Sequence, residues 1–471
     1  MEERTTKYVR YHIHTDTAEE IKKWPTRFRV KVGKVGLAKW LLREVFEHGL
    51  GKRREVVLSR PCMYGVFSGP VGGFSPRPQH CVGCLRCTTE FPGFVSVTHN
   101  PERKKLGDSF FTSNFIDALS YETLEGVIPV KGAGYRGKFG GQGWDGMWTD
   151  MSEIVRPTRD GIHGREFIST VVDIGFRPNY LEFDEGGQLI GRAPKVISIP
   201  LPILFDIPAN NDKPELAAGI TAKAAANLET LAVLPAAMIL KLGLAGSHLV
   251  PLVKAGEGDL LAKLGFVPDM VEIDGWDDDL AATILSLFPE AILSLRMEFP
   301  EKEVLLGYVE KGISTFHLLA DFHGEDDKGT FVLDLIRKAH KALVEAGIRQ
   351  EVTLLGSGGM IAAEHIPKAI LCGLDAVALD TPVMAALQAD FEGDCQHRET
   401  SWFSLPAKLS VDWGAQRLMN MTAAWRDQLL EITGAMGLRE IRRMRGEMGR
   451  AMFMKDLESD AFAGVVGYER A

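Results

Sequence analysis

The sequence lacks an apolar run that approaches the ~20 residues a membrane-spanning helix requires. Its N-terminal stretch, MEERTTKYVRYHIH, has no apolar core of the kind that secretory signal peptides carry. The chain has only six cysteines in 471 residues, too few and too clustered for the disulfide framework of a secreted protein. A net charge of −9 argues against a general nucleic-acid binder. These absences predict a cytoplasmic protein without a membrane span.

The composition is that of an ordinary globular protein, with 45% hydrophobic and 25% charged residues. The length suffices for two or three domains with a sizeable core. The pattern of the chain divides it into five segments. They are an N-terminal arm (1–60), a cysteine module (61–100), a Gly- and Arg-rich wrapping segment (101–195), a region of alternating apolar runs and helical stretches (196–400), and C-terminal helices (401–471).

Three cysteines, Cys81, Cys84 and Cys87, stand two residues apart in the stretch HCVGCLRCTTEFP. This spacing lets three thiolates converge on the corners of one iron–sulfur cube. A ferredoxin-type run has its fourth cysteine directly before the proline, but here that residue is Phe91. Cys62, 19 residues upstream of Cys81, is the candidate for the missing ligand. The four cysteines predict a [4Fe–4S] cluster, or a [3Fe–4S] cluster held by three of them.

Two other interpretations of these cysteines stay open. Zinc is bound by the same side chains, although zinc sites favour C-x-x-C pairs that are well separated in sequence. The cysteines are otherwise reduced thiols that lie close together by chance. A third cysteine after two more residues is more typical of iron–sulfur ligation, so we expect the protein to handle single electrons.

Between residues 200 and 380, short apolar runs alternate with helical stretches. Strands that are buried on both faces read as continuous apolar runs, and their alternation with helices implies parallel pairing. Eight such units predict an α/β fold, a closed (β/α)₈ TIM barrel. An open doubly wound sheet is the alternative, but no G-x-G-x-x-G follows the first strand. The predicted strands are Pro202–Ile207, Thr230–Pro235, His248–Val253, Asp269–Asp274, Ala291–Met297, Thr315–Ala320, Val352–Gly356 and Ala376–Asp380.

A barrel of this kind carries its chemistry at the carboxyl ends of its strands. The residues at these ends include Arg296 and His323, which we expect to be catalytic. The seventh strand leads into LLGSGGMIAAEH, a glycine turn before a helix, and such turns bind phosphate through backbone N–H groups. The predicted cofactor-binding residues are Gly356, Ser357, Gly358, Gly359 and Thr381.

Four motifs stand out around the predicted barrel: KGAGYRG, MWTDMSEIVRPTRDGIHGREFIS, VDIG and the C-terminal WGAQRLMNMTAAWRDQLLEITGAMGLREIRRMRGEMG. Together they resemble the FMN-binding glutamate synthase family, in particular its archaeal-type and stand-alone forms. The resemblance implies FMN in the barrel and an iron–sulfur relay ahead of it. It also implies reductive amination of 2-oxoglutarate, and a redox partner that is a ferredoxin or an NAD(P)H-oxidising flavoprotein subunit.

The chain also departs from this family. From its first residues, Met1-Glu2, we expect it to lack the family's N-terminal glutaminase domain with a cysteine nucleophile, and Arg296 stands where the family has a barrel lysine. The family's glycine-rich substrate loop is DFHGEDDKGT here, and its post-barrel cysteine cluster is reduced to Cys395. Asp380 precedes Thr381 where glycine is usual, and a carboxylate this close to an FMN phosphate would repel it.

Two hypotheses follow from the match and the departures. The first is an iron–sulfur, FMN-type oxidoreductase of glutamate synthase type. The second is a degenerate barrel without flavin, which serves as an electron-transfer or scaffold subunit of a larger redox complex, in a multi-subunit assembly or a homo-oligomer.

Overall fold

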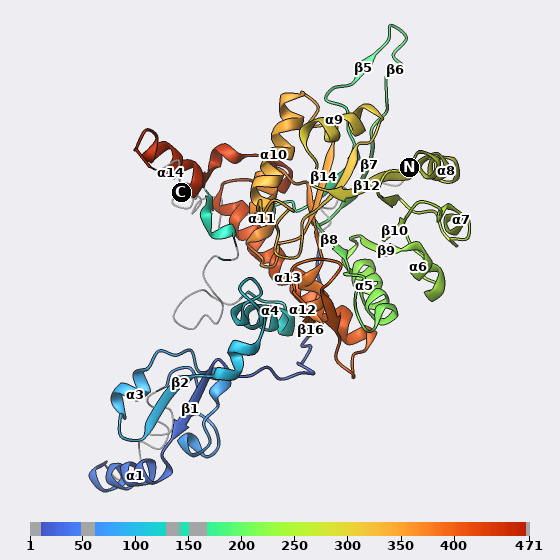
Figure 1. Ribbon diagram of the computed structural model, residues 1–471. Helices are drawn as coiled ribbons and strands as arrows, with labels where there is room; N and C mark the ends of the chain where they lie inside the picture. Colours follow the sequence, from blue (N-terminus) through green and yellow to red (C-terminus); the bar gives the residue numbers. More distant parts are fainter. Residues whose placement is uncertain (1–10, 49–61, 129–140, 142, 150–166, 468–471) are drawn as a thin grey trace, which may run out of the picture. The chain divides into compact units, whose positions relative to one another are not determined.

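The computed structural model describes residues 11–48, 62–128, 141, 143–149 and 167–467 (Figure 1). The chain divides into two compact units. The described residues of the first, here the cysteine unit, fall within Lys22–Ala118. The second, the barrel unit, is built from Met1–Ile21, Leu119–Ile128 and Gly140–Ala471. Within the described residues no helix has both the length and the apolar character to cross a bilayer.

The cysteine unit is organised around a two-stranded antiparallel sheet of β1 (Phe28–Val32) and β2 (Val95–His99). The inward residues of these strands pack with Val66 and Phe67 into a small apolar core, which also contacts three of the cysteines. The helices and 3₁₀ turns around the sheet are α1 (Lys34–His48), η1 (Gly72–Phe74), η2 (Pro78–His80), α3 (Arg86–Glu90) and η3 (Pro101–Lys105).

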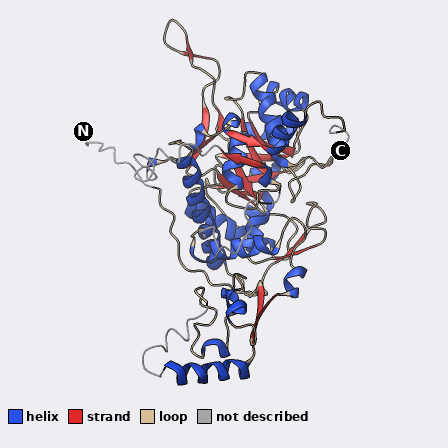
Figure 2. Ribbon diagram, turned by 90° about the vertical axis from the view of Figure 1, so that its left-hand side faces the viewer, coloured by secondary structure: helices blue, strands red, loops and turns tan. Residues whose placement is uncertain are grey.

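Eight parallel strands of the barrel unit close into a barrel, in the order β10-β11-β12-β13-β14-β15-β8-β9. Figure 2 shows these strands enclosed by helices. The fold class predicted from the alternating pattern is therefore confirmed, and the open doubly wound sheet is not formed. The strands are β8 (Ile203–Asp206), β9 (Ala232–Pro235), β10 (Leu249–Val253), β11 (Met270–Asp274), β12 (Ile292–Glu298), β13 (Thr315–Leu319), β14 (Thr353–Ser357) and β15 (Ala376–Leu379).

Each barrel strand is followed by a helix that covers it from outside. The clearest case is α10, whose buried side chains recur with the spacing of one helical face, from Val332 to Leu343. The barrel helices are α5 (Pro214–Leu228), α6 (Ala236–Leu242), α7 (Gly258–Leu261), α8 (Asp278–Leu287), α9 (Lys302–Glu310), α10 (Val332–Glu345), α11 (His365–Cys372) and α12 (Thr381–Ala386).

A hairpin of β4 (Val172–Phe176) and β7 (Lys195–Ile199) lies at the amino end of the barrel strands. Thr353, the first residue of β14, accepts a hydrogen bond from the Gly175 N–H (3.0 Å) and donates one to the Gly175 carbonyl (2.9 Å). The amino end is therefore covered, and the opposite mouth of the barrel is the one available to ligands.

The remaining elements extend the barrel unit. The long helix α13 packs on α5, and the β5–β6 hairpin projects from the unit in Figures 1 and 2. These elements are α4 (Ser113–Glu125, which begins in the cysteine unit), η4 (Trp144–Gly146), β3 (Met147–Thr149), β5 (Glu182–Phe183), β6 (Leu189–Ile190), β16 (Asp390–Glu392), β17 (Trp402–Ser404), α13 (Val411–Ala435), η7 (Ile441–Arg443), η8 (Met448–Arg450), β18 (Ala451–Phe453) and α14 (Met454–Phe462).

The C-terminal helices predicted over residues 401–471 do not include the basic stretch REIRRMRGEMGR. That stretch contains two 3₁₀ turns, η7 and η8, and no continuous helix. Gly446 between them has a φ of 71°, in the left-handed region that ends helices. The motifs KGAGYRG and MSEIVRPTRDGIHGRE lie wholly outside the described residues.

Candidate functional site

The four predicted cluster ligands, Cys62, Cys81, Cys84 and Cys87, line one small cavity of about 20 Å³ in the cysteine unit. The remaining wall is almost entirely apolar, because it is formed by Val30, Tyr64, Val66, Phe67, Val82, Leu85 and Val97. Cys62 lies 19 residues before Cys81, and the fold brings its side chain to the same cavity. Its role as the fourth ligand stays a prediction.

The backbone around Cys84 is bent by two residues in the left-handed region, Gly83 (φ 75°) and Leu85 (φ 59°). A side chain at position 83 would collide with the ring of Phe28, since a Cβ there would lie 2.3 Å from its Cζ. The left-handed backbone conformation of Leu85 is costly, because its Cβ approaches the backbone closely there. The two bends turn the chain so that successive cysteines face the same cavity.

The thiols are close enough to influence one another. Burial raises the pKa of Cys81, and a hydrogen bond from the Gly83 N–H opposes this shift. Burial also raises the pKa of Cys87 to about 11, and the neighbouring thiols of Cys81, Cys62 and Cys84 add to the effect. Clustered negative charge is therefore unfavourable here unless a cation or a cluster compensates it.

Four thiols in an otherwise apolar wall are a donor set that fits an iron–sulfur cluster, and the same atoms also ligate zinc. Among the described residues, no group of three or more histidine, cysteine, aspartate or glutamate side chains is placed to hold a single metal ion.

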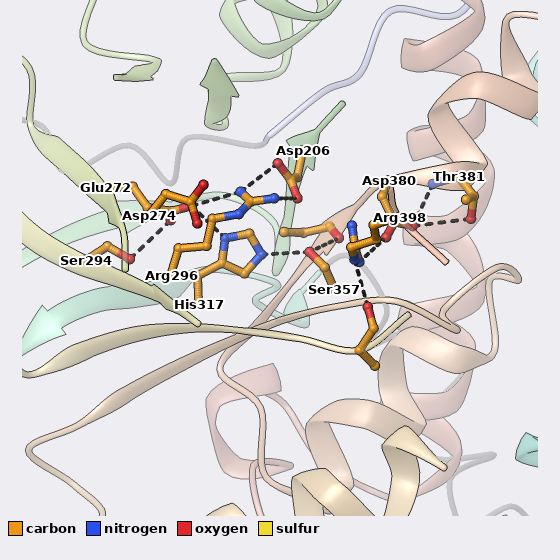
Figure 3. A network of polar contacts seen from close by, with 12 residues as sticks. Asp206, Glu272, Asp274, Ser294, Arg296, His317, Ser357, Asp380, Thr381 and Arg398 are labelled. Carbon is orange, nitrogen blue, oxygen red and sulfur yellow. Dashed lines mark hydrogen bonds and ion pairs between the residues drawn. The ribbon is translucent and has the colours of Figure 1, made fainter. Parts of the chain in front are cut away.

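The interior of the barrel contains a buried polar network that centres on Arg296 of β12 (Figure 3). Its guanidinium makes a two-pronged contact with Asp206 of β8, at 2.9 and 2.7 Å. The same group donates to Glu272 of β11 at 3.0 Å. Glu272 also accepts from Ser294 (3.1 Å) and from Nδ1 of His317 on β13 (2.9 Å). Charged side chains from β8, β11, β12 and β13 thus form one hydrogen-bonded network inside the barrel.

The hydrogen bonds of His317 define its protonation. Its Nδ1 lies against the Glu272 carboxylate, which only accepts. Its Nε2 lies 2.6 Å from the Ser357 hydroxyl, and that hydroxyl donates its one hydrogen to the Ala378 carbonyl at 3.0 Å. All these bonds are satisfied together only if both ring nitrogens carry a proton, so His317 is assigned as an imidazolium.

The network is then balanced in charge, with two carboxylates against a guanidinium and an imidazolium. Burial alone would raise the pKa of Asp206, but Arg296 and His317 outweigh it and hold that pKa below its ordinary value. The pKa of Glu272 is lowered in the same way, against its burial, by His317 and Arg296. Arg296 is therefore committed to two carboxylates and stays protonated.

The glycine turn after β14 packs directly on the loop after β13. Gly358 and Gly359 have positive φ values of 95° and 70°. A Cβ on Gly358 would lie 2.4 Å from the Asp321 carbonyl oxygen, and one on Gly359 would lie 2.5 Å from the Cα of Gly324. His323 belongs to this covering loop. The glycines are thus required by the close approach of two backbone segments.

Asp380 and Arg398 form an ion pair beside this turn, at the end of β15 (Figure 3). The Asp380 carboxylate is 1% exposed. It accepts from the N–H (2.5 Å) and the hydroxyl (3.2 Å) of Thr381, and from Arg398 at 2.7 Å. Arg398 also donates to the Ala320 carbonyl at 2.8 Å. The carboxylate occupies the donors that an anion would need, so an FMN phosphate does not fit this corner while Asp380 is ionised.

An open cleft of about 1000 Å³ lies at the same end of the barrel, between the loops that follow β12 and β13 and the segment 396–399. Its walls carry more carboxylates than cations. The carboxylates include Glu298, Asp321, Glu325 and Asp327, and the cations are Lys302, Lys328, Lys338, Lys341 and Arg398. Arg296, His323, the glycine turn and Thr381 are not among the described residues that line this cleft.

The predicted barrel residues are thus found in three places. Arg296 and Ser357 belong to one hydrogen-bonded network, through Glu272 and His317. His323, Gly358 and Gly359 lie where two loops pack on each other, and Thr381 donates its N–H to Asp380, the N-cap residue of α12. Glu272, His317 and Arg398 were not among the residues predicted from the sequence. The first two face inward from strands, where alternation is hidden by continuous apolar runs, and Arg398 lies beyond the barrel repeat.

Comparison with known sequences finds glutamate synthases. Residues 323–439 match the conserved region in glutamate synthase. An archaeal-type glutamate synthase [NADPH] from Dehalococcoides mccartyi is 23% identical over 435 residues, which is 79% of this chain and 86% of that protein. The archaeal glutamate synthase [NADPH] of Methanocaldococcus jannaschii is 32% identical over 121 residues, 24% of each chain.

Comparison with solved structures finds other barrels at low similarity. An IMP dehydrogenase/GMP reductase-like protein from Corynebacterium glutamicum is 12% identical with a TM-score of 0.39, covering 60% of this chain and 88% of that one. A mandelate oxidase is 13% identical with a TM-score of 0.36, covering 63% of this chain and 98% of that one.

Proposed function

Because the chain is a divergent relative of the archaeal-type glutamate synthases, we propose that it is an iron–sulfur oxidoreductase of glutamate synthase type. The observation that carries the redox part is the meeting of Cys62, Cys81, Cys84 and Cys87 at one apolar cavity. These four thiolates would hold a [4Fe–4S] cluster, which supplies one-electron transfer when bound. The apolar wall would keep water from the cluster, and the Gly83 N–H would stabilise the thiolate of Cys81.

The proposed reaction is the one that the relatives' name implies. Ammonia condenses with the carbonyl of 2-oxoglutarate, water leaves, and the resulting 2-iminoglutarate takes up two electrons and two protons to give glutamate. The electrons would come from a redox partner protein. Arg296 is fully engaged by Asp206 and Glu272, so its proposed part is to balance the buried carboxylates of the barrel interior rather than to transfer a proton.

A second candidate function is an electron-transfer or scaffold subunit whose barrel holds no flavin. The specific observation in its favour is the Asp380–Arg398 pair at the phosphate corner. The first candidate, with FMN in the barrel, rests on the kinship with glutamate synthases.

Anaerobically purified protein tests both candidates. Iron and sulfide analysis should give about four of each per chain, with a broad absorption shoulder near ~400 nm. Zinc in place of iron, or no metal, would refute the iron–sulfur proposal. Bands near ~370 and ~450 nm would establish flavin and the first candidate, and their absence at full cluster occupancy would leave the second.

A variant assigns the fourth ligand. We expect Cys62→Ser to lose the four-iron spectrum, while Cys395→Ser, which changes a cysteine of the barrel unit, keeps it. An unchanged spectrum in Cys62→Ser would remove that residue from the site. Production of glutamate from 2-oxoglutarate and ammonia, with dithionite-reduced ferredoxin as donor, tests the reaction itself.

A further inference from the structure

The charge of the chain is divided unequally between its two units. Residues 22–118 contain seventeen lysines and arginines against seven aspartates and glutamates. The rest of the chain contains 37 basic residues against 56 acidic ones. The net charge of −9 therefore conceals a strongly basic cysteine unit within an acidic protein, and such an asymmetry steers partners of one sign to one part of a molecule.

The surface next to the cysteine cavity is exposed and partly apolar. Cys84 is the exposed member of the four cysteines. Leu85, which follows it and lines the cavity, is 48% exposed, and Met63, which follows Cys62, is 83% exposed. Arg86 follows Leu85 in the sequence and is exposed; it pairs with Glu90 at 2.8 Å and also interacts electrostatically with Cys84. We call Met63, Cys84, Leu85 and Arg86 the cysteine face.

We propose that the cysteine face is the docking site of an acidic one-electron carrier protein. This inference rests on the proposed function, because a carrier is needed only if the four cysteines hold a redox centre. Redox encounters use small interfaces in which a few apolar side chains meet and surrounding charges set the approach. Met63 and Leu85 are the apolar contacts, and the basic unit supplies the attraction for a carrier of opposite charge.

Because the cysteine unit is basic, its partner is expected to be acidic. Two other kinds of partner are also negatively charged. A nucleic acid would respond to the basic residues and not to Met63 or Leu85. The acidic barrel unit of a second copy of the chain would bind without any carrier. The exposed apolar side chains beside Cys84 favour the carrier, and the experiment separates the three.

The test measures binding of an acidic ferredoxin to the full chain by titration calorimetry. We expect binding to weaken at least about tenfold when salt rises from about 50 to about 300 mM, because screening shortens the reach of the charges. Met63→Glu and Arg86→Glu should each weaken binding about tenfold or more. The matched controls Val267→Glu and Lys263→Glu, exposed positions of the barrel unit, should bind as the wild type does.

Distant charges test the steering separately. Replacing the exposed Lys31, Lys34 and Lys39 by glutamate should slow association and leave dissociation nearly unchanged. No binding of the ferredoxin, equal loss in the barrel-unit controls, preferential binding of duplex DNA, or self-association that competes with ferredoxin would each overturn the proposal. Iron analysis of every sample keeps this result apart from the proposed function, since a chain without a cluster would refute that proposal by itself.

Discussion

At the scale of single residues, the barrel interior depends on matched charges. Glu272 is fully buried and serves three donors, the guanidinium of Arg296, the imidazolium of His317 and the hydroxyl of Ser294. A buried network of charges adds little to stability when it is complete. Removing one partner is strongly destabilising, because an uncompensated charge stays buried. Each carboxylate of the network is therefore required by the cations that face it.

We expect Glu272→Gln to destabilise the protein by about 3–5 kcal/mol, because two buried cations then face one carboxylate. Ser294→Ala is the matched control. It removes only the neutral donor to the same carboxylate and should cost about 0.5–1.5 kcal/mol. Urea unfolding of both variants measures the difference, and equal losses would show that the charge balance inferred for His317 is wrong.

We expect Asp380 to lower the affinity of the barrel for the phosphate group of FMN. With Asp380→Asn the cap of Thr381 is kept, the charge is removed and Arg398 loses its carboxylate partner. We expect FMN to bind this variant at least about tenfold more tightly than the wild type, a gain of about 1.4 kcal/mol. Riboflavin lacks the phosphate and should bind both proteins alike. If riboflavin also bound the variant more tightly, the phosphate of FMN would not bind beside Asp380.

At the scale of elements, a buried histidine ties helix α10 to the segment after α13. Arg349 donates to Nδ1 of His340 at 3.0 Å, so that nitrogen is an acceptor and the ring is neutral. Gly373 and Gly446 pack on the ring, and a Cβ on either would lie within 2.4 Å of it. Burial, with Arg349 and Arg445 adding to it, lowers the pKa of His340 to about 4.

This histidine predicts a loss of stability toward acid. The unfolded chain takes up a proton at His340 near pH ~6.5, and the folded protein does so only near pH 4. The contribution is therefore present above about pH 6.5 and falls as the pH is lowered, by up to about 3 kcal/mol. His340→Gln should lose less stability than the wild type between about pH 7 and about pH 5 in urea unfolding. An identical slope in both proteins would contradict the prediction.

At the scale of the whole molecule, the two units differ in how they are stabilised. The barrel unit has an extensive buried core, whereas the fully buried part of the cysteine unit's core around Val66 is small. Small cores depend on metal centres or disulfides for stability. If the four cysteines hold a cluster, binding of that cluster is part of the folding free energy of this unit.

We therefore expect calorimetry to show two unfolding transitions, of which removal of the cluster with a chelator lowers only one. Hydrogen exchange should assign the lowered transition to residues 22–118, because cluster binding and folding are linked there. The barrel's transition serves as the internal control. A common shift of both transitions would show that the two units unfold as one.

The sequence by itself determined the barrel and the identity of the four clustered cysteines. Apolar runs of strand length alternating with amphipathic helices leave few other arrangements, because each run has to be buried on both faces. The predicted strand Ala376–Asp380 differs from β15 (Ala376–Leu379) by one residue, and Cys62 lines the same cavity as Cys81. Apolar periodicity and cysteine spacing are local properties of the chain, so they can be recognised in the sequence alone.

Only the tertiary structure decided which side chains meet. Arg296 and Asp206 are 90 positions apart and pair because the barrel closes between β15 and β8. Arg398 reaches Asp380 from a hairpin excursion that no repeat in the sequence marks. Ion pairs between residues far apart in the sequence depend on the distances that closure of the barrel creates. The local sequence pattern therefore does not predict them. The division of charge between the units was visible in the sequence, but the boundary at residues 22 and 118 that gives it meaning came from the fold.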